Sequence, residues 1–251
     1  MATLILRSAS KHLGTTISGV NARRRSSGDT DLAAVGALLA DPARARVLLA
    51  LADGRSLAAG VLAAEAGVSA STASHHLAKL VEARLISVSA RGRHRYFTLA
   101  GPRVAELIEA VARVAPVRPI TSLRQGTRLH AVRYARRCYD HLAGRLGVAV
   151  TEALCRQRLL SDDNSDVGYS VTVQGASALA QLGIPAQSGE AVRRCLDWSE
   201  QRDHIAGPLG TSLLSRFLDL GWLVQDPASR AVRLTDAGHS HLPDRLGVLL
   251  P

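Results

Sequence analysis

The sequence predicts a mostly α-helical protein with small β-hairpins, an α+β fold in two domains. Apolar residues recur at helical spacing over residues 31–82 and again from residue 103. Two short strand patterns, at residues 85–89 and 96–99, enclose a turn that contains a glycine. A motif near residue 141 returns 63 residues later (204 − 141 = 63), which indicates an internal repeat in the second half of the chain.

Three short helices are expected before residue 67. The first pattern ends at Asp41-Pro42, where Asp41 can cap the second helix and Pro42 fits its first turn, because a missing N–H costs nothing there. Residues 57–66 predict a third helix, and Gly67 allows a compact turn after it. The chain therefore predicts a helix, a turn and a further helix in series.

Residues 69–82 predict the helix after that turn. Ser69 can accept a hydrogen bond from an unpaired backbone N–H at the start of this helix. One face carries an apolar stripe of Ala73, Leu77, Leu80 and Val81. The opposite face carries short hydrogen-bonding side chains and one cation, namely Ser71, Thr72, Ser74, His75 and Lys79. Such side chains can approach base edges and phosphates closely, so this face predicts a DNA-reading surface.

The turn between the two strand patterns is strongly basic. Gly92 is available for a tight turn within residues 91–95. The basic side chains around it are Arg91, Arg93, His94 and Arg95. The tip of the predicted hairpin is therefore strongly basic, and these residues are candidate DNA-binding residues.

The charge of the chain is concentrated in its first part. The formal net charge is +10 and the pI is near 10.6, which implies attraction to polyanions. Residues 1–100 contain thirteen Lys and Arg against six Asp and Glu, so they supply seven of the ten excess charges. A basic pI alone is shared by many proteins that bind no polyanion, but here only three of the ten excess charges are left for residues 101–251.

The cellular setting follows from apolar runs and cysteines. No apolar run approaches the roughly 18–20 residues that a membrane span requires, so no membrane partner is expected. The three cysteines, Cys138, Cys155 and Cys195, are odd in number and far apart, which argues against a disulfide framework. We expect reduced thiols and a cytoplasmic protein.

Three segments together resemble the ArsR family of winged-helix transcriptional repressors: ADPARARVLLAL, LAAEAGVSASTASHHLAKLVEARLI and ARGRHRYFTL. The resemblance covers residues 31–115. It implies a winged helix-turn-helix in which Ser71, Ser74 and His75 enter the major groove of double-stranded DNA. It also implies that Arg91, Arg93 and Arg95 contact flanking phosphates or the minor groove from the wing. A helix at residues 103–114 would pair with its copy in a homodimer.

The chain departs from the family pattern in two places. Arg84 stands where family members often have the glycine that ends the reading helix, and a non-glycine residue in a left-handed cap is strained. The family's metal sites are also not expected here, because residues 57–66 hold no cysteine and residues 103–115 hold no histidine. Metal sensing is therefore not inherited with the fold.

The predicted organisation has four parts. Residues 1–30 form a basic arm, residues 31–116 the winged helix-turn-helix, residues 117–126 a linker rich in turn-forming residues, and residues 127–251 an effector or interaction domain. The last part is predicted to hold two winged-helix-like repeats, at about 127–190 and 191–251, because Asp140 to Gly147 matches Asp203 to Gly210.

The repeated Asp-His pairs have two interpretations. Imidazole and carboxylate suit a divalent metal or another small effector, and helical spacing would place Cys138 beside His141 and Asp197 beside His204. The candidate residues are Cys138, Asp140, His141, Asp197, Asp203 and His204. In the alternative, each Asp caps or pairs locally while each His packs against the other repeat. A rival sensor would use oxidation or arsenical binding at Cys138, Cys155 or Cys195.

The sequence thus predicts a sequence-specific DNA-binding transcriptional regulator, a dimeric repressor whose C-terminal domain senses an unidentified ligand, metal or thiol reagent or stabilises the assembly. The alternative is a protein-interaction module built on a winged helix without specific DNA readout. No glycine-rich phosphate loop, nucleophile elbow or metal-hydrolase helix is present, so the chain is not expected to be an enzyme, and no cofactor is assigned to it beyond the hypothetical divalent metal.

Overall fold

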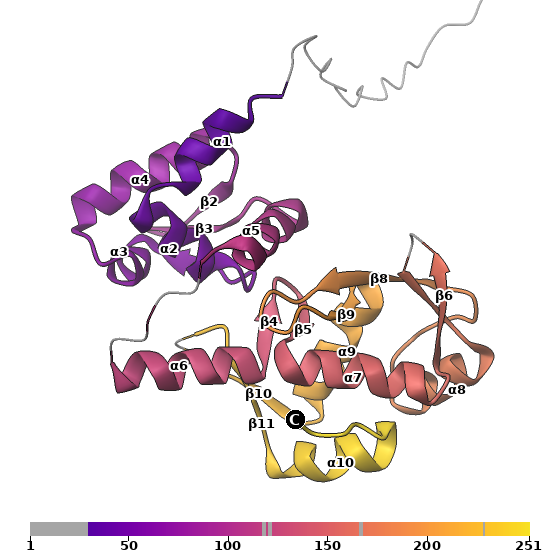
Figure 1. The fold of residues 1–251 in the computed structure, drawn as a ribbon. Helices are drawn as coiled ribbons and strands as arrows, with labels where there is room; N and C mark the ends of the chain where they lie inside the picture. Colours follow the sequence, from indigo (N-terminus) through magenta and orange to yellow (C-terminus); the bar gives the residue numbers. More distant parts are fainter. Residues whose placement is uncertain (1–29, 117–118, 120–121, 166–167, 228) are drawn as a thin grey trace, which may run out of the picture. The chain divides into compact units, whose positions relative to one another are not determined.

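The structure is a computed structural model that describes residues 30–116, 119, 122–165, 168–227 and 229–251 (Figure 1). The chain divides into two units, Met1–Leu32 and Ala33–Pro251. In the first unit the amide of Leu32 donates a hydrogen bond to the carbonyl of Thr30. Except for Thr30, the predicted basic arm lies outside the described residues.

The first part of the chain has the predicted order of helices with a three-stranded antiparallel sheet, β1-β3-β2 (Figure 1). Its elements are α1 (Leu32–Leu39), α2 (Pro42–Leu51), β1 (Leu57–Ala58), α3 (Ala59–Ala66), α4 (Ala70–Glu82), β2 (Ile86–Arg91), β3 (His94–Leu99) and α5 (Pro102–Val114). A buried cluster that includes Val47, Leu62, Leu80 and Phe97 joins α2, α3, α4 and the sheet. The α+β fold class is confirmed.

Two predicted boundaries in this part are wrong. Residues 57 and 58 form a strand and not the start of a helix, because Leu57 and Ala58 pair with Phe97 and Tyr96. The wing strands are longer than predicted, since Arg91 pairs with His94. Three of the basic residues of the predicted turn therefore lie on strands, and Gly92 and Arg93 form the turn itself.

The helix ends follow the capping residues. The Ser69 hydroxyl accepts a hydrogen bond from the Thr72 amide at 3.2 Å, which confirms the predicted start of α4. At the other end, Arg84 has a φ of 57°, in the left-handed region that favours glycine. The expected strain at this cap is therefore present, and the amide of Leu85 still reaches the carbonyl of Leu80 at 3.0 Å.

The cap of α2 gives a stability prediction. The Asp41 carboxylate accepts hydrogen bonds from the amides of Ala43 and Arg44, both at 2.9 Å. The bond from the Arg44 amide lowers the pKa of Asp41 below its ordinary value of 3.8. We expect Asp41→Ala to lower the free energy of unfolding by about 1 kcal/mol at about pH 7, measured by urea denaturation.

The pH dependence of this cost has a definite sign. A carboxylate whose pKa is lowered by folding stabilises the protein above its ordinary pKa, and this stabilisation is lost as the pH falls through the lowered value. The cost of Asp41→Ala should therefore shrink below about pH 3.8. Asp41→Asn is the control, because its amide oxygen can still cap the helix at every pH. A cost that stays constant down to about pH 3 would contradict the linkage.

The second part of the chain begins with a helix inside the predicted linker. Its elements are α6 (Leu123–Tyr134), β4 (Arg136–Cys138), β5 (His141–Ala143), α7 (Gly144–Arg156), β6 (Leu160–Ser165), β7 (Gly168–Val171), α8 (Val173–Gln181), β8 (Ala191–Leu196), β9 (Asp203–Ala206), α9 (Gly207–Asp219), β10 (Leu223–Gln225), β11 (Val232–Leu234) and α10 (Asp236–Leu246) (Figure 1). Because α6 starts at Leu123, the predicted linker is too long by residues 123–126.

The same order of elements occurs twice in this part. Helix α7 starts at Gly144 and α9 at Gly207, an offset of 207 − 144 = 63 residues. Helices α8 and α10 follow Thr172 and Thr235 at the same offset. Each threonine hydroxyl accepts a hydrogen bond from the amide three residues later, at 2.9 and 3.0 Å. The similarity extends from the sequence motif to the caps of the helices.

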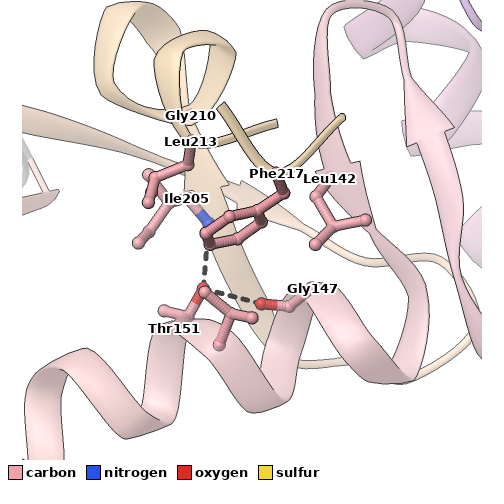
Figure 2. A pocket seen from close by; sticks show the side chains of 8 residues that line it. Leu142, Gly147, Thr151, Ile205, Gly210, Leu213 and Phe217 are labelled. Carbon is pink, nitrogen blue, oxygen red and sulfur yellow. Dashed lines mark hydrogen bonds between the residues drawn. The ribbon is translucent and has the colours of Figure 1, made fainter. Parts of the chain in front are cut away.

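One buried contact joins the two copies (Figure 2). The Thr151 hydroxyl on α7 donates to the carbonyl of Gly147 at 2.9 Å and accepts from the amide of Ile205 at 3.1 Å. The space left beside these bonds, lined by Leu142 and Phe217 among others, is about 10 Å³. This is the volume of about one water molecule, so the contact is packing and not a ligand site.

Candidate functional site

Helix α4 presents the predicted reading residues to solvent. Ala73, Leu77 and Leu80 are buried in the core, so the opposite face of the helix is exposed to solvent. That face carries the exposed side chains of Ser71, Thr72, Ser74, His75 and Lys79. The structure thus brings together all five residues that the sequence placed on one face.

The hydroxyl groups of this face are already oriented. The Ser74 hydroxyl donates to the carbonyl of Ala70 at 2.9 Å, so its oxygen lone pairs point away from the helix backbone and can accept. The hydroxyls of Ser71 and Thr72 lie 3.0 and 2.9 Å from that of Ser69. Such short, fixed groups suit contacts with base edges and phosphates.

The wing adds a basic surface next to α4. Arg91, Arg93, His94 and Arg95 are all exposed around the turn at Gly92. The guanidinium of Arg91 lies over the Tyr96 ring, 5.4 Å from its centroid. Among the ion pairs of the described residues, none involves Lys79 or these three arginines. Their charges are therefore available to phosphates.

A second candidate site lies in the other part of the chain, where two cysteines and two histidines converge. Across the β4–β5 hairpin Cys138 pairs with His141, and across the β8–β9 hairpin Cys195 pairs with His204. One ligand atom from each of the four side chains lies within 4.8 Å of the other three. We call these four residues the Cys2His2 cluster.

The cluster corrects the predicted geometry and the predicted residue set. Its members meet through strand pairing and not on helical faces, so the expected one-turn and two-turn spacings are wrong. Cys195, which the sequence suggested only as a thiol for oxidation or arsenical binding, joins the cluster, whereas Cys155 is outside it. Asp203 is also outside and lies 3.7 Å from Arg194. No pattern in the sequence paired Cys195 with Cys138, because hairpins of different length carry them.

The two remaining aspartates support the histidines. Asp140 Oδ1 lies 2.9 Å from His141 Nδ1, and Asp197 Oδ2 lies 3.3 Å from His204 Nδ1. The Nε2 atoms of the two rings face each other at 3.1 Å. At this distance the two Nε2 atoms form a hydrogen bond, with one ring as donor and the other as acceptor, so both rings direct a nitrogen at the same point.

Burial and hydrogen bonding shift the ionisation of these groups. A hydrogen bond with Cys195, together with burial, raises the pKa of the Cys138 thiol to about 12. Burial alone would lower the pKa of His141, but the hydrogen bond to Asp140 raises it above its ordinary value. Burial would raise the pKa of Asp197, yet His204 and Arg136 hold it well below its usual range. Asp197 is therefore a buried carboxylate anion.

A buried ion-pair network links Asp197 to α5. Arg136 is fully buried, and its Nη2 atom lies 2.9 Å from Asp197 Oδ1 and 3.4 Å from Glu109 Oε2. Glu109 is itself buried on α5, and its Oε1 atom also lies 3.1 Å from Nη1 of Arg230. No sequence pattern pointed to this network, because Arg136 lies 27 residues after Glu109, although a glutamate beside Ile108 in a helix rich in apolar residues was an available signal.

A cavity separates part of α5 from the cluster. Its volume is about 880 Å³. Cys138, His141 and Cys195 line it together with Glu106 and Arg113 of α5, among other residues. The cluster is therefore reachable from this cavity, whose lining includes charged side chains.

Comparison with known proteins identifies the family. A family model described as a helix-turn-helix domain matches residues 39–89, from the end of α1 to β2. The HTH-type transcriptional regulator YdfF of Bacillus subtilis (strain 168), itself uncharacterized, is 42% identical over 223 residues, which cover 87% of this chain and 98% of YdfF. The chain belongs to the HTH-type transcriptional regulators. This regulator therefore resembles YdfF through both of its parts.

Other relatives match the DNA-binding part of the regulator. The HTH-type transcriptional regulator CmtR of Mycobacterium tuberculosis (strain ATCC 25618 / H37Rv) is 36% identical over 100 residues, 38% of this chain and 84% of CmtR. A solved fragment of Mb0332 from Mycobacterium bovis is described as a homodimeric winged helix-turn-helix and a possible ArsR-family regulator. It is 31% identical to this chain, and the match has a TM-score of 0.30 and covers 34% of this chain and 85% of the fragment. None of the described helices of the regulator has the length and hydropathy of a membrane span.

Proposed function

We propose that this regulator binds a specific double-stranded operator as a homodimer, represses transcription, and acts in the cytoplasm, where its thiols stay reduced. The observation that carries the proposal is the surface of α4 and the wing, where exposed hydroxyls and the imidazoles of His75 and His94 lie beside cations that have no acidic partner among the described residues. Hydroxyl and imidazole groups can read base edges in the major groove, and arginines beside them can hold phosphates.

The residue roles divide accordingly. Ser71, Ser74 and His75 contact bases, with Thr72 and Lys79 at the edge of the groove. The wing residues Arg91, Arg93, His94 and Arg95 contact phosphates or the minor groove. Exposure of all nine side chains and the absence of bulky apolar groups among them support this division.

Two apolar surfaces support a homodimer. Helix α1 has the sequence LAAVGALL and no buried residue. Helix α5 leaves Val111 40% exposed and Val114 84% exposed. Apolar helix faces of this kind are covered in stable proteins, and a second copy of the same helices would cover them in a two-fold assembly.

Genomic footprinting with the purified full-length protein tests the proposal. We expect a small set of enriched fragments that contain two related half-sites, about 10 base pairs from centre to centre, because a two-fold dimer places its reading helices about one DNA turn apart. Affinity for these fragments should fall steeply with salt as Lys and Arg displace condensed counterions. No enriched fragments and no salt dependence would favour the protein-interaction module instead.

A further inference from the structure

We propose that the Cys2His2 cluster binds one zinc-class divalent metal ion, and that the bound ion governs how the second part of the chain holds α5. The metal site rests on the cluster alone and is not required by DNA reading. The control of α5 rests on the proposed function, because α5 is taken there as part of the dimer surface.

The donor set and its size favour a single ion. Two thiolates and two imidazoles are the ligands that tetrahedral zinc prefers, with bonds of about 2.3 Å to sulfur and about 2.0–2.1 Å to nitrogen. At these lengths two ligand atoms of one tetrahedron lie about 3.3–3.8 Å apart. The four donor atoms of the cluster, all within 4.8 Å of one another, need only small rotations of the side chains to reach that spacing.

The facing imidazoles provide an independent argument. Asp140 lies at hydrogen-bond distance from Nδ1 of His141, Asp197 lies 3.3 Å from Nδ1 of His204, and the two Nε2 atoms face each other at 3.1 Å in a buried place. Without a metal this is the distance of an N–H···N hydrogen bond, in which one ring donates to the other. A metal ion can take the place of the shared proton and bind both nitrogens, and the two aspartates are then the carboxylate partners that ligand histidines commonly have.

The backbone holds both histidines in place. A side chain on Gly147 would put its Cβ atom 2.6 Å from the carbonyl oxygen of Leu142, and one on Gly210 would lie 2.6 Å from that of Ile205 and 3.0 Å from the His141 Cβ atom. Glycine at these positions lets α7 and α9 pack directly on the two histidine-bearing hairpins. Each hairpin supplies one cysteine and one histidine, so an ion would cross-link the two copies.

A cavity gives access to the site, and a chain of buried contacts connects the site to α5. The cavity of about 880 Å³ reaches Cys138, His141 and Cys195. From His204 the contacts run to Asp197, then to Arg136 and then to Glu109 on α5. An ion that fixes the ring of His204 therefore also fixes the carboxylate of Asp197. This carboxylate pairs with Arg136, which in turn pairs with Glu109 of α5.

Cobalt binding tests the site directly. The full-length protein is stripped with a chelator and titrated with Co²⁺, a spectroscopic substitute for Zn²⁺ in such sites. We expect saturation at about one ion per chain, with the visible bands of a tetrahedral site and a thiolate-to-cobalt charge-transfer band, and displacement of both by Zn²⁺. Cys195→Ser and His204→Gln should weaken binding at least about tenfold, and Cys195→Ser should reduce the charge-transfer band.

Matched controls separate ligation from folding. Cys155→Ser removes the third cysteine, and His130→Gln removes an exposed histidine on α6; both should keep the wild-type stoichiometry and spectrum. Zn²⁺ should raise the melting temperature of the wild type and of both controls, but not that of Cys195→Ser. An unchanged circular dichroism spectrum of the metal-free variant shows that it is folded. A Cys195→Ser protein that binds Co²⁺ like the wild type, or a cobalt spectrum without a thiolate band, would overturn the site.

Operator binding tests the control of α5 separately. With a fragment obtained by footprinting, the Kd of metal-free and zinc-loaded protein should differ about fivefold or more, the usual lower range of allosteric coupling. The difference should disappear in Cys195→Ser and persist in Cys155→Ser. If the protein binds zinc but its metal-free and zinc-loaded forms have the same operator affinity, the proposed effect of the ion on α5 is wrong and the metal site stands. Absence of any operator overturns the proposed function, while the cobalt result still decides the site.

Discussion

The double variant Ser74→Ala, His75→Ala should bind its operator and random DNA with nearly the same affinity. Both side chains are exposed on the face of α4 that lies opposite its buried stripe, and each removed base contact costs about 1–3 kcal/mol on the correct sequence only. The operator Kd should rise by about 100-fold, whereas the Kd for random DNA should change little. Fluorescence anisotropy at one fixed salt concentration measures both.

Arg93→Ala provides the contrast that separates reading from backbone contact. A phosphate contact contributes to binding of every sequence, so this variant should weaken binding to both DNAs by a similar factor and lower the slope of log K against log salt by about 1. Arg202→Ala is a matched control, because it removes an exposed arginine of the C-terminal part. Equal losses on both DNAs for the double variant and for Arg93→Ala would refute the proposed division of roles.

Arg136→Ala should lower the free energy of unfolding by about 3–5 kcal/mol. The guanidinium is fully buried between Glu109 and Asp197, and its removal leaves Asp197 buried without its cationic partner and Glu109 with Arg230 alone. Breaking a buried ion pair from one side is costly because the remaining charge is still desolvated. Urea denaturation of the protein in the presence of a chelator measures this cost without a contribution from bound metal.

Arg193→Ala is the matched control for that loss. Arg193 also pairs with a glutamate of α5, Glu106, but the two side chains are 52% and 48% exposed. Exposed ion pairs contribute at most about 1 kcal/mol, because water and salt screen them and the side chains lose entropy. Two variants of similar stability would show that the buried network does not hold the second part of the chain to α5.

Local chemistry explains why much of the first part could be predicted. The start of α4 at Ser69 and the cap at Asp41 depend on side chains that bond to amides within three residues. The exposed set on α4 follows from a periodicity of 3.6 residues once Leu77 and Leu80 are buried. The strand at Leu57 could not be found in this way, because it exists only through pairing with Phe97, which is forty residues later.

The sequence by itself determined the winged helix-turn-helix, the exposed face of α4 and the presence of a motif that returns after 63 residues, because these features depend on spacing along one segment. The tertiary structure alone decided which side chains that motif brings together. Cys138 meets His141 across one tight hairpin and Cys195 meets His204 across a longer one, and the packing of α7 and α9 then brings the two hairpins together. Strand register and the close approach allowed by Gly147 and Gly210 set these contacts, and neither can be deduced from the spacing of the residues.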